Sequence, residues 1–327
     1  MKAIAQRTYG EARVLELTDV PKPVPRPGEV LLEVRAAGVD MGVWHVMAGR
    51  PYLGRLAFGL FKPHQPVRGM EVAGVVAAVG DQVTEFRPGD RVFGTGKGTF
   101  AEFSTAAPKR LARIPENVGF AQAAVSAISG VTALQALRAA PDAATVLVIG
   151  AGGGVGSFAV QMAKARGMRV TGVCSTGKVE FVRGLGADEV VDYTRSAPGE
   201  DLGGGTYDLI LDIAGNRPLS VLRGALHPHG TLVIVGGEGG TSFFGGMSRN
   251  MVAAARSSRK GQRFTGLLSR TNARDLAELA DAMADGRLVP AVDTAYPLAE
   301  AVRAVEHLRS GRAHGKVVLI PNAGSGA

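Results

Sequence analysis

The sequence predicts an α/β protein with two domains, one rich in β-strands and the other built around a doubly wound parallel sheet. Three observations support this fold class: short β segments separated by Gly and Pro in the first third, alternating strands and helices in the middle, and a glycine-rich turn that joins one of those strands to a helix. The length of 327 residues agrees with two domains.

The first third is expected to be mainly β structure. In the strand that begins at Val30, apolar side chains on one face alternate with a mostly charged face that carries Glu33 and Arg35. The proline-rich segment 21–29 before it is expected to be an extended connector. Further strands are expected at 70–80, 90–94 and 99–105.

From residue 121 onward the pattern changes to helices and buried strands. A helix is expected over 121–140 and is followed by strands that alternate with helices, which is typical of a parallel, doubly wound sheet. The expected strands are 145–150, 169–174, 189–193, 207–215 and 231–237, with helices at 157–167 and 178–186. The chain ends with helices at 273–286 and 299–311 and a strand at 316–320.

The composition narrows the class of protein. Hydrophobic residues make up 46% and charged residues 20%, which is typical of a chain that buries a core. The net charge is +8, but the arginines are scattered, so nucleic acid is not the expected partner. The charge-free stretches 117–137 and 143–163 contain Gly, Gln or Ser and are not expected to span a membrane. The single cysteine, Cys174, and the absence of a signal-like N-terminus favour a cytoplasmic location.

The glycine-rich turn carries the clearest functional signal. The strand 145–150 leads into Ala151, Gly153, Gly154, Val155 and Gly156, and a helix follows. Such a turn lets backbone N–H groups approach a pyrophosphate, while the N-terminus of the helix stabilises its charge. The alternative is an ordinary flexible loop, but the strands and helix around the turn match a dinucleotide-binding unit.

The end of the next strand indicates which dinucleotide is bound. An NAD enzyme places Asp or Glu there, whereas this chain has Ser175, Thr176 and Lys178 after Cys174. Hydroxyl groups and a cation suit a 2′-phosphate, so NADPH is the expected cofactor. In the alternative interpretation the two hydroxyls cap the next helix and Lys178 is solvated.

These residues resemble a known family. The pattern Gly74-x-Val76-x-x-Val79-Gly80, followed by Gly89-Asp90, is similar to that of the medium-chain dehydrogenase/reductase superfamily. So are the segments 150–164 and 174–188. Within the superfamily, the match is to the zinc-independent quinone oxidoreductase and enoyl reductase branch, and it covers nearly the whole chain.

The resemblance implies a domain organisation and an activity. A GroES-like catalytic domain would comprise residues 1–121 and 270–327, and a Rossmann domain that binds NADPH would comprise 122–269, with the active site in a cleft between them. The implied reaction is reduction of an activated double bond or a quinone, a small-molecule substrate, in a homodimer paired through the Rossmann sheets.

The zinc ligands of related alcohol dehydrogenases are missing. Those relatives have a Cys after the first strands, where this chain has Asp40 or its neighbours. They also have a His directly before a Glu, where this chain has Met70 before Glu71. A thioether is a poor ligand for Zn²⁺. No metal is therefore expected.

The resemblance also implies residues for the catalytic domain. Asp40 stands where many relatives have an active-site Asn, and a carboxylate donates a hydrogen bond only when it is protonated. Tyr52 matches a tyrosine that faces the substrate and could donate to a developing enolate; the alternative is a surface tyrosine. Trp44 and Met47 are expected on a helix beside the substrate pocket or, as an equal alternative, in the core.

The remaining implied residues would contact the cofactor or lie near the nicotinamide. Thr132 resembles a threonine that contacts the nicotinamide ribose, and Tyr193 resembles a tyrosine near the adenosine phosphate. After the last Rossmann strand, Gly236 and Gly237 would approach the nicotinamide and Phe243 would line the substrate pocket.

The sequence therefore predicts an NADPH-dependent reductase of α,β-unsaturated carbonyls or quinones. Two other functions stay open: a carbonyl reductase or alcohol dehydrogenase that works without metal, and an NADPH-binding protein without turnover.

Overall fold

The computed structural model describes residues 1–196, 202–236 and 261–321. The chain divides into two compact units: residues 1–131 with 270–327, and residues 132–269. The first boundary falls at residue 131 rather than at the expected 121, because helix α3 (Phe120–Ala124) packs on strands β3 and β4 of the first unit.

The first unit is built mainly from β-strands, as predicted. A seven-stranded sheet has the order β14-β15-β3-β4-β5-β7, with β6 paired to β3, and β1 and β2 form a separate hairpin. Its strands are β1 (Lys2–Ala5), β2 (Glu16–Asp19), β3 (Val30–Val39), β4 (Glu71–Val79), β5 (Arg91–Thr95), β6 (Phe103–Ala106), β7 (Leu111–Arg113), β14 (Val292–Pro297) and β15 (Lys316–Ile320).

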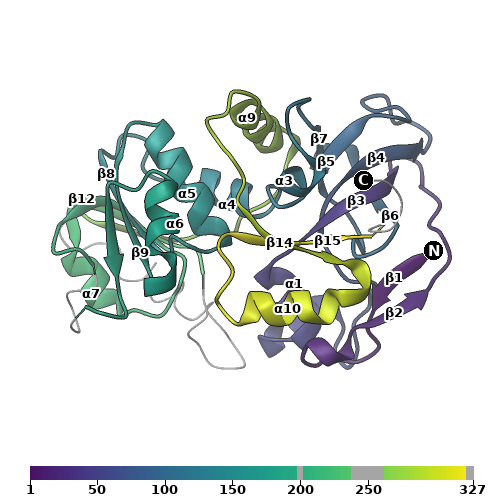
Figure 1. Cartoon of the computed structure of the whole chain (residues 1–327), viewed down its shortest axis with the longest axis horizontal. Helices are drawn as coiled ribbons and strands as arrows, with labels where there is room; N and C mark the ends of the chain where they lie inside the picture. Colours follow the sequence, from purple (N-terminus) through teal and green to yellow (C-terminus); the bar gives the residue numbers. More distant parts are fainter. Residues whose placement is uncertain (197–201, 237–260, 322–327) are drawn as a thin grey trace. The chain divides into compact units, whose positions relative to one another are not determined.

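The helices of the first unit come from both ends of the chain. They are α1 (Met41–Ala48), α2 (Arg55–Phe58), α3, α9 (Ala273–Ala284) and α10 (Ala301–Arg309). The C-terminal strand β15 lies beside β3 and pairs with it antiparallel (Figure 1), so the last residues of the fold complete a sheet begun near residue 30.

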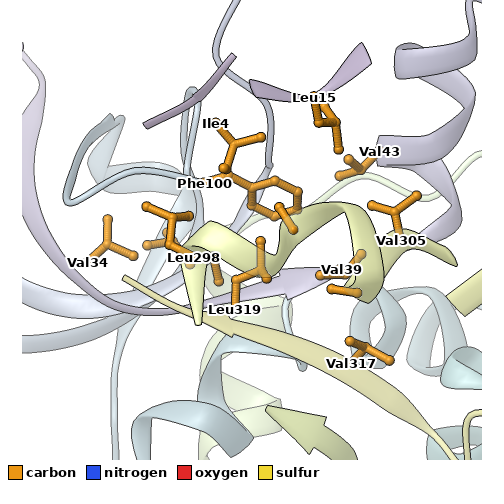
Figure 2. Packing of buried hydrophobic residues seen from close by; sticks show 14 of the residues in the cluster. Ile4, Leu15, Val34, Val39, Val43, Phe100, Leu298, Val305, Val317 and Leu319 are labelled. Atoms are coloured by element: carbon orange, nitrogen blue, oxygen red, sulfur yellow. The ribbon is translucent and has the colours of Figure 1, made fainter. Parts of the chain in front are cut away.

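The core of the first unit joins distant segments of the sequence. Figure 2 shows Ile4, Val39, Phe100, Leu298 and Val317 gathered in one cluster of buried hydrophobic residues. This shared burial holds the C-terminal segment on the N-terminal strands.

The second unit is the predicted doubly wound domain. Its strands are all paired in parallel in the order β10-β9-β8-β11-β12-β13. The strands are β8 (Thr145–Ile149), β9 (Arg169–Cys174), β10 (Glu189–Asp192), β11 (Tyr207–Asp212), β12 (Leu226–Ile234) and β13 (Arg263–Gly266), and the helices are α5 (Gly154–Ala165), α6 (Val179–Gly184) and α7 (Leu219–Gly224). The predicted fold class is thereby confirmed, although the sequence did not indicate the short strands β7, β13 and β14.

The helix predicted over 121–140 is interrupted. The structure has α3 and then α4 (Ser129–Leu137), with residues 125–128 between them. In this gap the Ile128 amide donates to Oε1 of Glu71 at 2.7 Å. A buried carboxylate on a distant strand thus binds the backbone between the two helices.

Candidate functional site

The glycine-rich turn of the second unit links β8 directly to α5. Gly150 has a φ of +91°, in the region that favours glycine. A Cβ on Gly156 would overlap the carbonyl oxygen of Gly150, so the helix approaches the strand closely only because this position lacks a side chain. Helix α5 begins at Gly154 with Gly153 as its N-cap. The turn therefore brings together the predicted residues Ala151, Gly153, Gly154, Val155 and Gly156 at the N-terminus of a 12-residue helix.

Lys178 lies against this turn. A Cβ on Gly152 would stand 2.7 Å from Cδ of Lys178, and Nζ of Lys178 donates to the Gly152 carbonyl at 3.3 Å. Ser175 precedes the short 3-10 helix Thr176–Lys178 and makes no side-chain cap there. A cation from the segment that follows β9 is thus held beside the glycine-rich turn.

Sequence reasoning missed a carboxylate in this region. Oγ1 of Thr176 donates to Oδ2 of Asp192 at 2.6 Å, and Thr194 donates to Oδ1 of Asp192. The hydrogen bond from Thr176, and then that from Thr194, lowers the pKa of Asp192. Asp192 joins this region only through the sheet, because β10 pairs in parallel with β9 and places Asp192 opposite Cys174.

Tyr193 and Cys174 lie at the same edge of the sheet. The Tyr193 amide donates to the Cys174 carbonyl at 3.1 Å, and the half-exposed Tyr193 ring lies 5.9 Å from the Arg217 guanidinium. Burial raises the pKa of the Cys174 thiol to about 11, and the Asp192 carboxylate adds to this shift. The thiol is therefore protonated at neutral pH and suited to packing rather than nucleophilic chemistry.

The other predicted cofactor residues have different surroundings. Oγ1 of the buried Thr132 lies 2.8 Å from Oγ of Ser269, so its hydroxyl already has a partner. A Cβ on Gly236 would overlap the carbonyl oxygen of Ile213, which makes glycine necessary where the chain leaves β12. Gly237 and Phe243 lie outside the described residues.

A buried charge cluster occupies the first unit. Oε2 of Glu71 accepts from Nζ of Lys316 at 2.5 Å, and both side chains are almost completely buried. Burial raises the pKa of Glu71, Lys316 opposes this shift, and the charge of Asp40 adds to it. Oδ1 of Asp40 accepts from the Val43 amide at 3.0 Å and caps α1, while Oδ2 is buried without a hydrogen-bond partner among the described residues.

Trp44 and Met47 belong to the core rather than to a pocket surface. Both lie on α1, as predicted, but Met47 is completely buried and Trp44 is 7% exposed, and both pack in the hydrophobic cluster of the first unit. The Arg309 guanidinium lies 3.8 Å from the centre of the Trp44 ring. Val43, also buried in this cluster, and the partly buried Val46 line a pocket of the first unit.

That pocket has a volume of about 330 Å³ and lies within the first unit. Tyr52 is absent from its lining. It stands in a short 3-10 helix, is 40% exposed, and has the Arg55 guanidinium 4.8 Å from its ring centre. Met70, directly before Glu71, does line the pocket, as does Arg68.

The described residues contain no group of three or more His, Cys, Asp and Glu side chains that could hold a metal ion. None of the described helices is both long enough and apolar enough to cross a membrane.

Comparison with known proteins identifies both parts of the chain. Residues 26–116 match the alcohol dehydrogenase GroES-like domain, and residues 185–319 match the zinc-binding dehydrogenase family. The name of the second family includes zinc. The matched segment 185–319 contains no cysteine, because the one cysteine of the chain is Cys174.

Full-length relatives define the branch. The chain is 32% identical to the chloroplast envelope quinone oxidoreductase homolog of Arabidopsis thaliana, over 98% of both chains. It is 31% identical to the 2-methylene-furan-3-one reductase of Solanum lycopersicum, over 98% of this chain and 79% of that protein. The Escherichia coli quinone oxidoreductase solved with NADPH is 26% identical, with a TM-score of 0.83 over 98% of this chain and 100% of that one. The fold and these identities together show that this chain belongs to the medium-chain dehydrogenase/reductase superfamily, in its quinone oxidoreductase and enoyl reductase branch.

Proposed function

We propose that this protein is an NADPH-dependent, zinc-independent reductase that transfers hydride to an α,β-unsaturated carbonyl or to a quinone. The observation that carries the proposal is the glycine-rich turn with the stem of Lys178 across Gly152. Relatives named for quinone and furanone reduction, and a quinone oxidoreductase solved with NADPH, support the same reaction class.

The second unit has residues that fit the cofactor. The backbone N–H groups at the start of α5 would bind the pyrophosphate, because glycine at 153 and 154 puts no side chain at this helix N-terminus. Lys178 and Ser175 would bind the 2′-phosphate, with Tyr193 near the adenosine. Thr176 is a weaker candidate than the sequence suggested, because its hydroxyl donates to Asp192. Thr132 and Gly236 would lie near the nicotinamide, which supplies the hydride from C4 when NADPH is bound.

The first unit would supply the proton and the substrate pocket. The exposed Tyr52 phenol would donate to the carbonyl oxygen as negative charge develops there. Asp40 is a second candidate donor, because its Oδ2 has no hydrogen-bond partner in the described part of the chain, but it donates only when it is protonated. Val43, Val46 and Met70 would form part of the apolar wall against which the substrate body packs.

The proposed chemistry does not need zinc. Met70 precedes Glu71 at the position where zinc-dependent relatives have a histidine, and a thioether binds Zn²⁺ poorly. We expect activity to survive prolonged chelation and the purified protein to contain no stoichiometric zinc by elemental analysis. One zinc per chain, with activity lost on its removal, would contradict this part of the proposal.

We extend the proposal to the assembly and location of the protein. The six-stranded sheet would pair with that of a second copy to form a homodimer, as the family resemblance implies, and the protein would act in the cytoplasm. Size-exclusion chromatography with light scattering tests the dimer directly.

One panel of substrates separates the three candidate functions. NADPH oxidation should be measured with enones, quinones and saturated aldehydes, together with NADPH affinity. Turnover with enones or quinones supports the proposal, and turnover confined to aldehydes indicates a carbonyl reductase. Tight NADPH binding without turnover in any class indicates a protein that only binds the cofactor.

A further inference from the structure

One short stretch of the first unit, which we call the 50–62 segment, exposes several large apolar side chains. Leu56, Phe58, Leu60 and Phe61 are 71%, 46%, 54% and 87% exposed and lie within six consecutive positions. Helix α2 carries the first two, and the turn after it carries the other two. Single apolar residues are common on protein surfaces, whereas a concentration of them marks an interaction site.

Backbone contacts hold the turn of this segment in a defined shape. The His64 amide donates to the Phe58 carbonyl at 2.8 Å, which closes the turn. The Tyr9 hydroxyl donates to the Gly59 carbonyl at 2.5 Å and ties the turn to the N-terminal part of the chain. Gly59 has a φ of +118°, and a Cβ there would overlap the Lys62 carbonyl oxygen. The fold therefore presents the apolar side chains at the tip of this turn to the solvent.

The charge of this part of the sequence has one sign. No Asp or Glu occurs between Asp40 and Glu71, whereas the 50–62 segment contains Arg50, Arg55 and Lys62. The Arg50 and Lys62 side chains are exposed, and neither has an ion-pair partner among the described residues. The whole chain has a net charge of +8, which also favours an anionic surface as the partner.

Exposed apolar side chains next to exposed cations suit the surface of an anionic bilayer. Apolar side chains enter the boundary between headgroups and acyl chains, and Lys and Arg attract anionic headgroups. A protein partner would need a surface shaped to fit Phe61, whereas a bilayer accepts an apolar side chain of any shape.

We propose that the 50–62 segment docks this protein reversibly on an anionic lipid bilayer. Leu60 and Phe61 would enter the headgroup boundary, and Arg50 and Lys62 would contact lipid phosphates. This inference goes beyond the proposed reductase activity, and its tests need neither NADPH nor a substrate.

Co-sedimentation with vesicles tests the docking directly. One set of vesicles contains equal amounts of phosphatidylglycerol and phosphatidylcholine, and the other contains phosphatidylcholine alone. We expect wild-type protein to bind the anionic set at least about tenfold more tightly, since each cation near such a surface contributes about fivefold in affinity. Added salt should weaken this binding, because it screens the charges. Equal affinity for the two sets, or no binding to the anionic set at low ionic strength, would overturn the inference.

Variants with matched controls locate the docking site. Leu60→Ser/Phe61→Ser should weaken binding to the anionic vesicles at least about tenfold, and Lys62→Gln about fivefold. Val24→Ser, at a position that is 82% exposed, and Lys109→Gln, at another exposed position, should leave the binding nearly unchanged. Losses as large in the two controls would show that the 50–62 segment is not the docking site.

A fluorescent variant keeps the test decisive if the serine variants do not fold. With anionic vesicles, the emission of Phe61→Trp should shift to shorter wavelength, whereas that of the wild-type protein should not, because Trp44 is buried. An unshifted spectrum under saturating vesicles would contradict insertion of the tip.

The other occupant to distinguish is a second copy of the chain. Light scattering without lipid should give the same mass for wild-type protein and for Leu60→Ser/Phe61→Ser. A dimer that becomes a monomer in this variant, together with no binding to anionic vesicles, would make the 50–62 segment an interface between copies and overturn the inference.

Discussion

The two units hold their functional groups in different ways. In the second unit the candidate site is made largely of backbone: a turn of small residues, a helix N-terminus, and one cation whose stem lies on Gly152. In the first unit it is made of buried charged side chains, Asp40, Glu71 and Lys316, with Arg68 beside a pocket.

The two candidate sites therefore depend on the sequence in different ways. The turn between Gly150 and Gly156 is local, so a few neighbouring residues determine it. The pair of Glu71 and Lys316 joins residues 245 positions apart, so it forms only when the whole first unit has folded. We therefore expect substitutions in the first unit to act on stability and those in the second to act on cofactor binding.

Removing the charge of Lys316 should have the largest effect. Lys316→Met would leave the Glu71 carboxylate buried without its partner, which typically costs about 3–5 kcal/mol of unfolding free energy. Denaturant unfolding followed by the fluorescence of Trp44, the one tryptophan of the chain, would report this loss in the first unit.

A surface pair provides the matched control. Lys2 and Asp19 lie 2.7 Å apart with exposed side chains, so Lys2→Met should lower the free energy of unfolding far less than Lys316→Met does. The double variant Glu71→Gln/Lys316→Met should recover part of the loss. Equal small losses for Lys316→Met and Lys2→Met would show that the buried pair does not stabilise the first unit.

Replacing Lys178 should alter the choice between NADPH and NADH. The expected change in binding free energy is smaller than the loss of unfolding free energy expected for Lys316→Met. A charge-assisted hydrogen bond to a phosphate contributes about 1.5–3 kcal/mol, so Lys178→Met should weaken NADPH binding about ten- to a hundredfold. NADH binding should change little, and the Trp44 unfolding curve should stay close to that of the wild type. The assignment fails if the wild-type protein binds NADPH and NADH equally.

Removing the Tyr52 hydroxyl should have a smaller effect than replacing Lys316 or Lys178. Tyr52 is half-exposed, and its hydroxyl would contribute one hydrogen bond to the transition state. Tyr52→Phe should lower kcat by no more than about a hundredfold, at the low end for a proton donor, without changing the affinity for NADPH. An unchanged kcat would remove Tyr52 as the donor and leave the rest of the proposed function intact.

The second unit was largely predictable because its signals are short. Hydrophobic strands followed by amphipathic helices indicated the doubly wound sheet, and the glycine-rich segment lies, as expected, between a strand and the start of a helix. The sequence did not indicate that Asp192 lies opposite Cys174. That position follows from the pairing of β10 with β9, which is a property of the sheet and not of one segment.

The first unit was less predictable, because its functional side chains are placed by contacts between segments that are far apart in the sequence. The sequence indicated that α1 carries Trp44 and Met47, but which face of a short apolar helix is buried depends on the elements packed around it. Glu71 likewise meets the segment between α3 and α4 only in the folded unit, where it accepts from the Ile128 amide. Buried charges held by long-range contacts have no local sequence pattern.

The most direct test of the proposed function compares matched substrates with NADPH. An enone or quinone spreads the developing negative charge, whereas an alkoxide formed from a saturated aldehyde lacks the several kcal/mol that a bound cation would supply. We expect kcat/KM for 3-nonen-2-one or a quinone to exceed that for nonanal by at least about tenfold, which corresponds to about 1.4 kcal/mol of barrier. A higher kcat/KM for nonanal would contradict the account.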